Sequence, residues 1–161
     1  MSPFNNFLNK TNSYSFNNSW IIDAPLEHTW NELLKYKKWV AWCDSLLKVE
    51  PLNQFDRLQK GNHLKTVWKG ALPYRVSFDA VINEITPYSF LSFNVTGDLY
   101  GKGICHFLPS DDQTTVNFIW NVSPSKLWMK ICSPFAKSVF IENHDRIIAQ
   151  AITGFAQMIK D

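Results

Sequence analysis

The longest amphipathic run in the chain, residues 136–160, constrains the fold more than any other feature of the sequence. At about 100° per residue, one face collects the apolar side chains Phe140, Ile147, Ile148, Ala151, Ile152, Phe155 and Met158. The opposite face collects Glu142, Arg146, Gln150, Thr153, Gln157 and Lys160. Pro134 suits the first turn of a helix. The pattern therefore predicts one long helix that begins there and packs by a single face.

His144 interrupts the apolar face of this helix, between Phe140 and Ile148. Two interpretations stay open. The ring is either a core histidine bonded to a carbonyl or a neighbouring side chain, or a polar group that projects into a cavity. In a cavity it would hold the polar end of an apolar ligand or move a proton. Burial favours the neutral imidazole in either case. No residue of a suitable type is spaced to share a metal ion with it.

Between residues 48 and 123 the pattern changes to a period of two, which indicates antiparallel strands with one apolar and one wet face. Short turns between the strands favour a meander. The candidate strands cover residues 48–55, 63–71, 74–86, 89–96, 99–108 and 114–123. The other expected elements are a strand over 14–22, helices over 25–34 and 38–46, and a short helix over 124–132. Residues 1–13 are expected to form an N-terminal arm, and residues 14–161 a single domain.

Composition allows a large core, since 45% of the 161 residues are apolar and twelve are Phe and seven Trp. The net charge of +2 comes from scattered Lys and Arg residues, which predicts no nucleic-acid partner. No apolar run approaches the roughly 20 residues that span a bilayer. No signal-peptide pattern is present, and the three cysteines lack a pairing or metal spacing. We therefore expect a cytoplasmic protein without stable membrane insertion.

Sequence motifs for known chemistries are missing. There is no HExxH, CxxC or Gly-rich phosphate loop, so we expect no metal and no cofactor. Strand alternation places Arg75 and Asp79 on the wet face, with Glu84 at a strand end, where all three are expected to be solvated. The remaining histidines, His28, His63 and His106, are expected at the surface or at strand edges.

A one-sided sheet must cover its apolar face, and the C-terminal helix is the one predicted element long enough to do so. Four segments carry a resemblance to a known superfamily: Trp20–Trp30, Trp39–Trp42, Gly97–Gly103 and Phe140–His144. With the order of elements, they resemble the helix-grip (SRPBCC, START-like) superfamily of lipid-transfer domains, birch-pollen-allergen-like proteins and polyketide cyclases/dehydrases. The resemblance implies an α+β fold in which a curved antiparallel sheet of about seven strands wraps around the helix. It also implies a hydrophobic ligand between sheet and helix.

On that basis we expect a small protein that binds a lipid, a polyketide-like molecule or another aromatic compound. The expected ligand contacts are His144, Asn143, Phe140, Ile147, Trp68, Phe78, Phe93, Phe118 and Trp120. Rings of this size either fill the hollow or wall a pocket.

Two alternatives stay open. The first is a cyclase, dehydrase or hydrolase with His144 as acid or base. It requires a second titratable or hydroxyl group beside that ring, for which Tyr74, Tyr88 and Tyr100 are the candidates. The second alternative is an interaction module with a filled cavity and exposed aromatics around Trp39 and Trp128. The Lys- and Trp-containing segment 35–42 is expected to be either a solvated helix junction or a site of transient membrane contact. The sequence does not indicate the oligomeric state.

Overall fold

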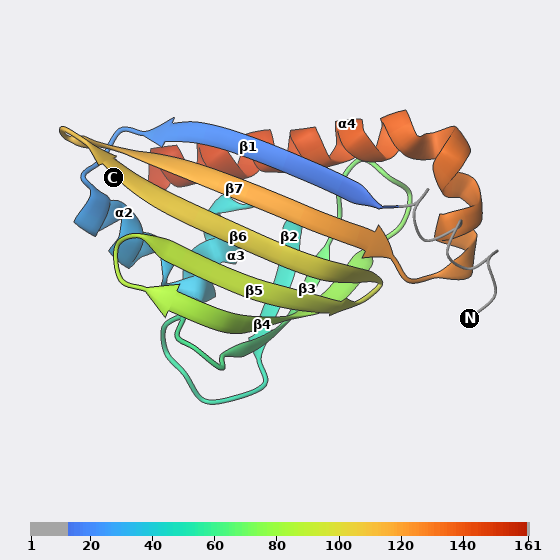
Figure 1. The fold of residues 1–161 in the computed structure, drawn as a ribbon, viewed down its shortest axis with the longest axis horizontal. Coiled ribbons are helices and arrows are strands. Elements are labelled where there is room, and N and C mark those ends of the chain that lie inside the picture. The colour runs from blue at the N-terminus through green and yellow to red at the C-terminus, as the bar shows by residue number, and fades with distance from the viewer. Residues whose placement is uncertain (1–12, 161) are drawn as a thin grey trace.

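The computed structural model describes residues 13–160, and for residues 127–136 the backbone alone. Its elements, in chain order, are β1 (Tyr14–Ile22), α2 (Leu26–Leu33), the 3-10 turn η1 (Tyr36–Lys38), α3 (Trp39–Trp42), β2 (Leu46–Pro51), β3 (His63–Trp68), β4 (Val76–Thr86), β5 (Phe90–Gly97), β6 (Leu99–Ser110), β7 (Gln113–Pro124) and α4 (Leu127–Met158). In Figure 1 the strands form one curved layer, and α4 runs behind this layer beside β1. The arm expected over residues 1–13 lies, apart from Ser13, outside the described residues.

The seven strands form one antiparallel sheet in the order β1-β7-β6-β5-β4-β3-β2. Strands β2 to β7 are neighbours in chain order, so the predicted meander is confirmed. The first strand joins the far edge of the meander, where Tyr14 pairs with Val122 and Ile22 pairs with Thr114. The predicted α+β architecture, a curved sheet around a long C-terminal helix, is thus confirmed.

The period-two pattern places the apolar residues of each strand on the face toward α4. On β4 this gives buried Phe78, Ala80 and Ile82. A register shift between Ile82 and Glu84 then adds one residue to the strand. Because a bulge turns the following side chains over, Ile85 packs against the core while Glu84 is exposed. Glu84 is therefore solvated, as expected, although strict alternation would have turned it inward.

Two helix predictions were wrong. The short helix over 124–132 and the long helix from Pro134 are one continuous element, α4 (Leu127–Met158). A proline inside a helix removes one hydrogen bond and commonly produces a kink instead of an end, and Figure 1 shows α4 bending near its beginning. The helix expected over 38–46 ends at Trp42, because Cys43 adopts an extended backbone and Leu46 pairs with Trp68 in the sheet.

Helix α4 is held against α3 by direct backbone contact at Gly154. A Cβ atom at this position would lie 1.8 Å from the carbonyl oxygen of Trp42. Only glycine allows this approach, and the contact fixes the distance between the helix and the rest of the fold. Nearby, the Ser45 hydroxyl donates to Oε1 of Gln150 at 2.9 Å. These contacts position the C-terminal half of α4 over the sheet.

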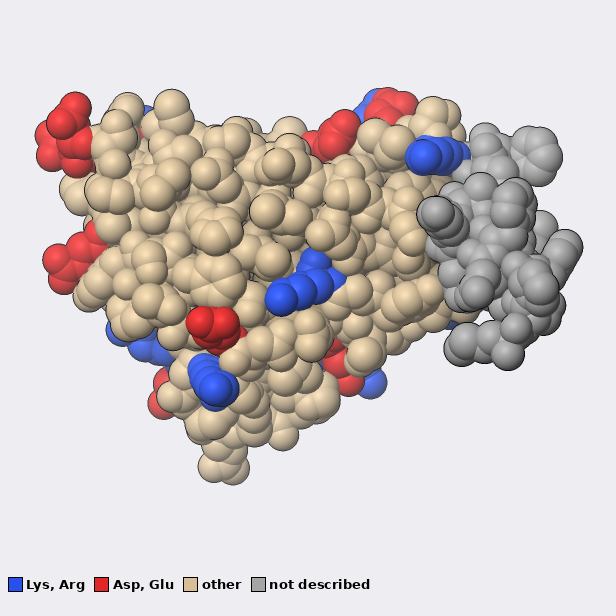
Figure 2. Space-filling view, in the orientation of Figure 1, with Lys and Arg blue, Asp and Glu red and all other residues tan. Residues whose placement is uncertain are grey.

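Charged side chains are sparse on the outer face of the sheet, which Figure 2 shows in the orientation of Figure 1. The outward positions of β1 and β7 are mostly Ser, Thr and Asn, as in Ser15, Asn17, Ser19, Thr115 and Asn117. Among the described residues, no helix combines the length and the apolar character that crossing a membrane requires.

Candidate functional site

Two cavities lie between the sheet and α4. We call the first the loop chamber, because residues Gly70, Leu72 and Tyr74 of the β3–β4 loop form part of its wall; its volume is about 210 Å³. The second, the helix chamber, has a volume of about 220 Å³ and is lined by Thr29 and Leu33 of α2 and by Trp39 and Trp42 of α3. The sequence left open whether aromatic rings fill the hollow. The structure shows that they wall it.

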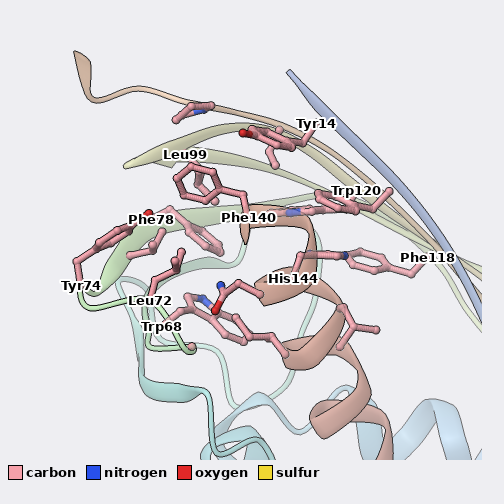
Figure 3. Close-up of a pocket in the computed structure, with 18 of the residues that line it drawn as sticks. Tyr14, Trp68, Leu72, Tyr74, Phe78, Leu99, Phe118, Trp120, Phe140 and His144 are labelled. Atoms are coloured by element: carbon pink, nitrogen blue, oxygen red, sulfur yellow. The ribbon is translucent and has the colours of Figure 1, made fainter. Parts of the chain in front are cut away.

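All nine side chains expected to contact a ligand line the loop chamber: Trp68, Phe78, Phe93, Phe118, Trp120, Phe140, Asn143, His144 and Ile147. Figure 3 labels six of them around the space: Trp68, Phe78, Phe118, Trp120, Phe140 and His144. The rings lie along the walls in pairs; Trp68 and Phe78, for example, stack with centroids 6.1 Å apart and planes within 11°. Their role in binding stays a prediction, but their common location is a property of the fold.

His144 projects from α4 toward β1, where its ring stacks on Phe16 with the centroids 3.7 Å apart. Its Nε2 atom lies 3.4 Å from Oδ1 of Asn18, a long contact that a small ligand group can compete with. Burial lowers the pKa of His144 from 6.5 to about 4, and the nearby carboxylate of Asp145 offsets only part of this effect. The imidazole is therefore neutral at pH 7, with one nitrogen that donates and one that accepts.

Asn18 is the residue of the candidate site that sequence reasoning missed. Its side chain shares the inward face of β1 with Tyr14, Phe16, Trp20 and Ile22. The alternation of β1 could have pointed to Asn18, because it places an amide in the middle of an otherwise apolar strand face. A polar group on such a face needs a hydrogen-bond partner. The partner, His144, is 126 residues away in the chain.

By sequence, no protein-family model and no curated protein matches the chain. Solved structures do match it in shape. The protein TTHA0849 from Thermus thermophilus superposes with a TM-score of 0.77 at 13% identity, over 91% of this chain and 97% of that one. The Zhui aromatase/cyclase from Streptomyces sp. R1128 superposes with a TM-score of 0.75 at 10% identity, over 92% of this chain and 94% of that one. Ara h 8.0201 superposes with a TM-score of 0.67 at 7% identity, over 91% of this chain and 97% of that one. The chain has the helix-grip fold.

Within this helix-grip cavity, Asn143 has a structural contact that the sequence did not suggest. Its Oδ1 atom accepts a hydrogen bond of 2.7 Å from the backbone N–H of Ala71. Gly70 makes this approach possible, because a Cβ there would lie 2.2 Å from the same oxygen. Asn143 therefore ties the β3–β4 loop to α4 and fixes one wall of the loop chamber.

The enzyme alternative for a helix-grip protein of this kind requires a proton-transfer partner for His144. Of the described residues, Asn18 alone lies within hydrogen-bond distance of the ring, and an amide neither gives nor takes a proton at neutral pH. Tyr74 contributes to the wall of the loop chamber, whereas Tyr88 and Tyr100 line neither chamber. The arrangement thus supplies a hydrogen-bonding pair and not an acid–base pair.

Other candidate groups lie away from the helix-grip cavity. Asp79 contacts Nε2 of His63 at 3.1 Å on the outer side of the sheet, and His106 is exposed beside the ring of Phe90. His28 lies 3.3 Å from the carbonyl oxygen of Ile159, a contact between α2 and the end of α4. The described side chains include no group of three His, Cys, Asp or Glu residues placed to hold a metal ion.

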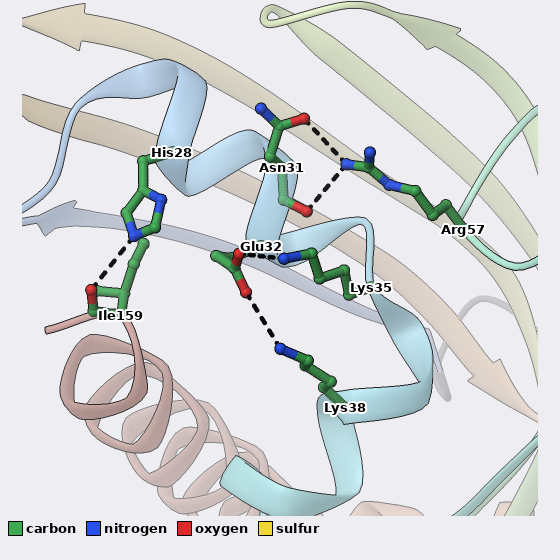
Figure 4. Close-up of polar contacts among 7 residues, drawn as sticks. All are labelled: His28, Asn31, Glu32, Lys35, Lys38, Arg57 and Ile159. Carbon is green, nitrogen blue, oxygen red and sulfur yellow. Dashed lines mark hydrogen bonds and ion pairs between the residues drawn. The ribbon is translucent and has the colours of Figure 1, made fainter. Parts of the chain in front are cut away.

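The lysines of segment 35–42 are paired with carboxylates. Figure 4 shows Lys35 and Lys38, each beside a different carboxylate oxygen of Glu32. The Nζ atom of Lys38 lies 3.9 Å from Oε2 of Glu32. Lys37 contacts Asp56 at 2.7 Å. The two tryptophans of this segment, Trp39 and Trp42, line the helix chamber instead of facing outward. These ion pairs fit a solvated helix junction, and both tryptophans are half-buried. Transient membrane contact at this segment stays a prediction.

Proposed function

We propose that this protein binds an uncharged, largely apolar small molecule in the loop chamber, with the ligand's one polar group at His144 and Asn18. The observation that supports this most directly is the chemistry of the wall. Among the described side chains that line the chamber there is no Lys, Arg, Asp or Glu, and the imidazole is neutral at pH 7. A charged ligand would lose its hydration without gaining a counter-ion.

The apolar walls supply most of the affinity and the polar pair supplies orientation. Removing about 200 Å² of ligand surface from water contributes roughly 5 kcal/mol. A single hydrogen bond to the ring adds about 0.5–1.5 kcal/mol. The long contact between His144 and Asn18 leaves room for a ligand hydroxyl or carbonyl to bond to either side chain. A phenol, an alcohol or a ketone has the matching chemistry.

The enzyme alternative lacks such support. The Zhui aromatase/cyclase shares the fold at only 10% identity, and the described part of the chain offers His144 no proton-transfer partner. The filled-core alternative loses its basis as well, because the space between sheet and helix is open.

A pair of probes that differ in one hydroxyl group tests the proposal. We expect 4-butylphenol to bind and to quench the fluorescence of Trp68 and Trp120, which line the chamber. In His144→Leu its affinity should fall about threefold to tenfold, the equivalent of one hydrogen bond. The affinity for 4-butyltoluene, which lacks the hydroxyl, should stay the same or rise slightly. His106→Leu, an exposed histidine outside both chambers, is the matched control.

Two results would count against the proposal. If neither probe binds the unmodified protein, the chamber is not a ligand site of this class. If both probes bind and His144→Leu affects them equally, the hydrogen-bond role of His144 is wrong although the chamber binds ligands.

A further inference from the structure

The loop chamber and the helix chamber meet at three side chains. Phe93 of β5, Phe118 of β7 and Ile148 of α4 line both cavities. We call these three residues the waist. Phe93 also packs against both hydrophobic clusters of the core, one beside each chamber. Any molecule that extends from one chamber into the other must pass these side chains.

The ring of Phe93 lies flat on the sheet because its cross-strand neighbour is a glycine. Gly103 of β6 pairs with Phe93 on one side and with Trp120 on the other. A Cβ atom at position 103 would lie 2.2 Å from Cζ of Phe93 and within 2.8 Å of both Cε atoms. The missing side chain thus leaves a recess in the sheet, and the ring of Phe93 occupies it instead of standing in the cavity.

The helix chamber suits a hydrocarbon. Its described wall is formed by aliphatic and aromatic side chains, with the hydroxyls of Thr29 and Thr66 and the thiol of Cys105 as exceptions. Both hydroxyls donate to backbone carbonyls, those of Ala24 and Phe78 respectively. An apolar chain that enters this chamber therefore leaves both hydroxyls paired. The buried indole N–H of Trp42 has no hydrogen-bond partner among the described residues even without a ligand, so an apolar chain costs it no bond.

We propose that both chambers receive one elongated ligand, and that Phe93, lying in the recess at Gly103, sets how far the apolar tail of that ligand reaches. This inference rests on the proposed function, which places the polar end at His144. The ligand class is narrowed to an uncharged molecule with a hydrogen-bonding head and an unbranched apolar tail.

A series of 4-alkylphenols with tails from ethyl to decyl tests the inference. In the unmodified protein each added methylene should raise the affinity about fourfold until the tail reaches the end of the helix chamber. In Gly103→Ala the new Cβ displaces the Phe93 ring into the waist, so the rise should stop at a shorter tail. For 4-octylphenol the loss should be on the order of 100-fold, while 4-ethylphenol binds as before.

A second substitution separates this effect from general damage to the strand. In Gly103→Ala/Phe93→Leu the smaller side chain clears the waist, and the longer tails should bind again. Gly103→Ala/Phe78→Leu is the matched control, because Phe78 lines the loop chamber but not the helix chamber; it should not restore them. Should Gly103→Ala fail to fold, Phe93→Trp narrows the waist without changing β6 and should shorten the tail limit.

The outcomes distinguish this inference from the proposed function. Failure of 4-ethylphenol to bind the unmodified protein would overturn the proposed function and the inference with it. Binding of 4-ethylphenol together with the same tail-length profile in Gly103→Ala, or recovery with Phe78→Leu as complete as with Phe93→Leu, would overturn the inference alone.

Discussion

The buried imidazole of His144 makes the stability of the protein depend on pH in a direction that can be worked out from its surroundings. Burial lowers the pKa of this ring in the folded chain to about 4, from its ordinary value of 6.5. As the pH falls below 6.5, the imidazole of the unfolded chain binds a proton, whereas the buried imidazole of the folded chain stays neutral until the pH approaches 4. Protonation then favours unfolding. The contribution of the neutral ring to the free energy of unfolding is therefore complete above pH 6.5 and is lost as the pH falls toward 4.

The size of this loss follows from the same values. Between pH 8 and pH 5, about 1.5 pH units lie below the pKa of the unfolded chain, and each unit corresponds to about 1.4 kcal/mol. The ring is only partly enclosed, so we reduce the resulting value of about 2 kcal/mol to about 1–2 kcal/mol. This amount is a substantial fraction of the stability of a typical domain.

Urea unfolding of the unmodified protein and of His144→Gln, each at pH 8 and pH 5, isolates the contribution of the ring. Both chains carry the same carboxylates, including Asp145 beside the ring, so the other titrating groups cancel in the comparison. We expect the unmodified protein to lose about 1–2 kcal/mol more than the variant over this interval. Equal losses in the two proteins would show that the ring takes up a proton freely in the folded state. The neutral hydrogen-bonding role would then be wrong.

Three further predictions concern the frame around the cavity. Gly154→Ala should destabilise the protein by about 1–3 kcal/mol, because its Cβ would lie 1.8 Å from the rigid backbone oxygen of Trp42; a gain in urea stability, usual for this change in an open helix, would contradict the contact. Asn143→Ala should speed amide exchange at Ala71, whose N–H loses its acceptor, and unchanged exchange would show that the loop is held otherwise. Burial raises the pKa of the Cys105 thiol to about 12. With the other two cysteines replaced by serine, this half-buried thiol should therefore react with a thiol reagent much more slowly in the folded protein than after urea is added, and equal rates would contradict the raised pKa.

Most of the fold was predictable because it follows from local periodicity. A period of two between residues 48 and 123, followed by a period of 3.6, is enough to predict a one-sided sheet and one covering helix. Those patterns depend only on which side of each element avoids water. Where local rules competed, prediction failed. Pro134 suggested a helix boundary, but the backbone of α4 continues through it, because a proline inside a helix can bend the helix without ending it.

The candidate site divides in the same way. Alternation predicted that Trp68, Phe78 and Trp120 share the face toward the helix, and they do line one chamber. It did not predict how far apart the two walls stand, and that distance decides whether the rings fill the space or surround it. The contact of Gly154 with Trp42 sets this distance at one end of the cavity. Neither residue type indicates in the sequence which residue it will contact.

By itself the sequence determined the strand meander and the covering helix, their apolar faces and the presence of a lone imidazole on that helix. Only the tertiary structure decided that β1 pairs with β7, and this pairing brings Phe16 and Asn18 to His144. Only the tertiary structure laid Phe93 into the recess at Gly103. The physical reason is that the preference for burial belongs to each residue separately and can therefore be read from the sequence. The shape of a cavity depends on pairs of distant residues whose separation is fixed when the whole chain packs.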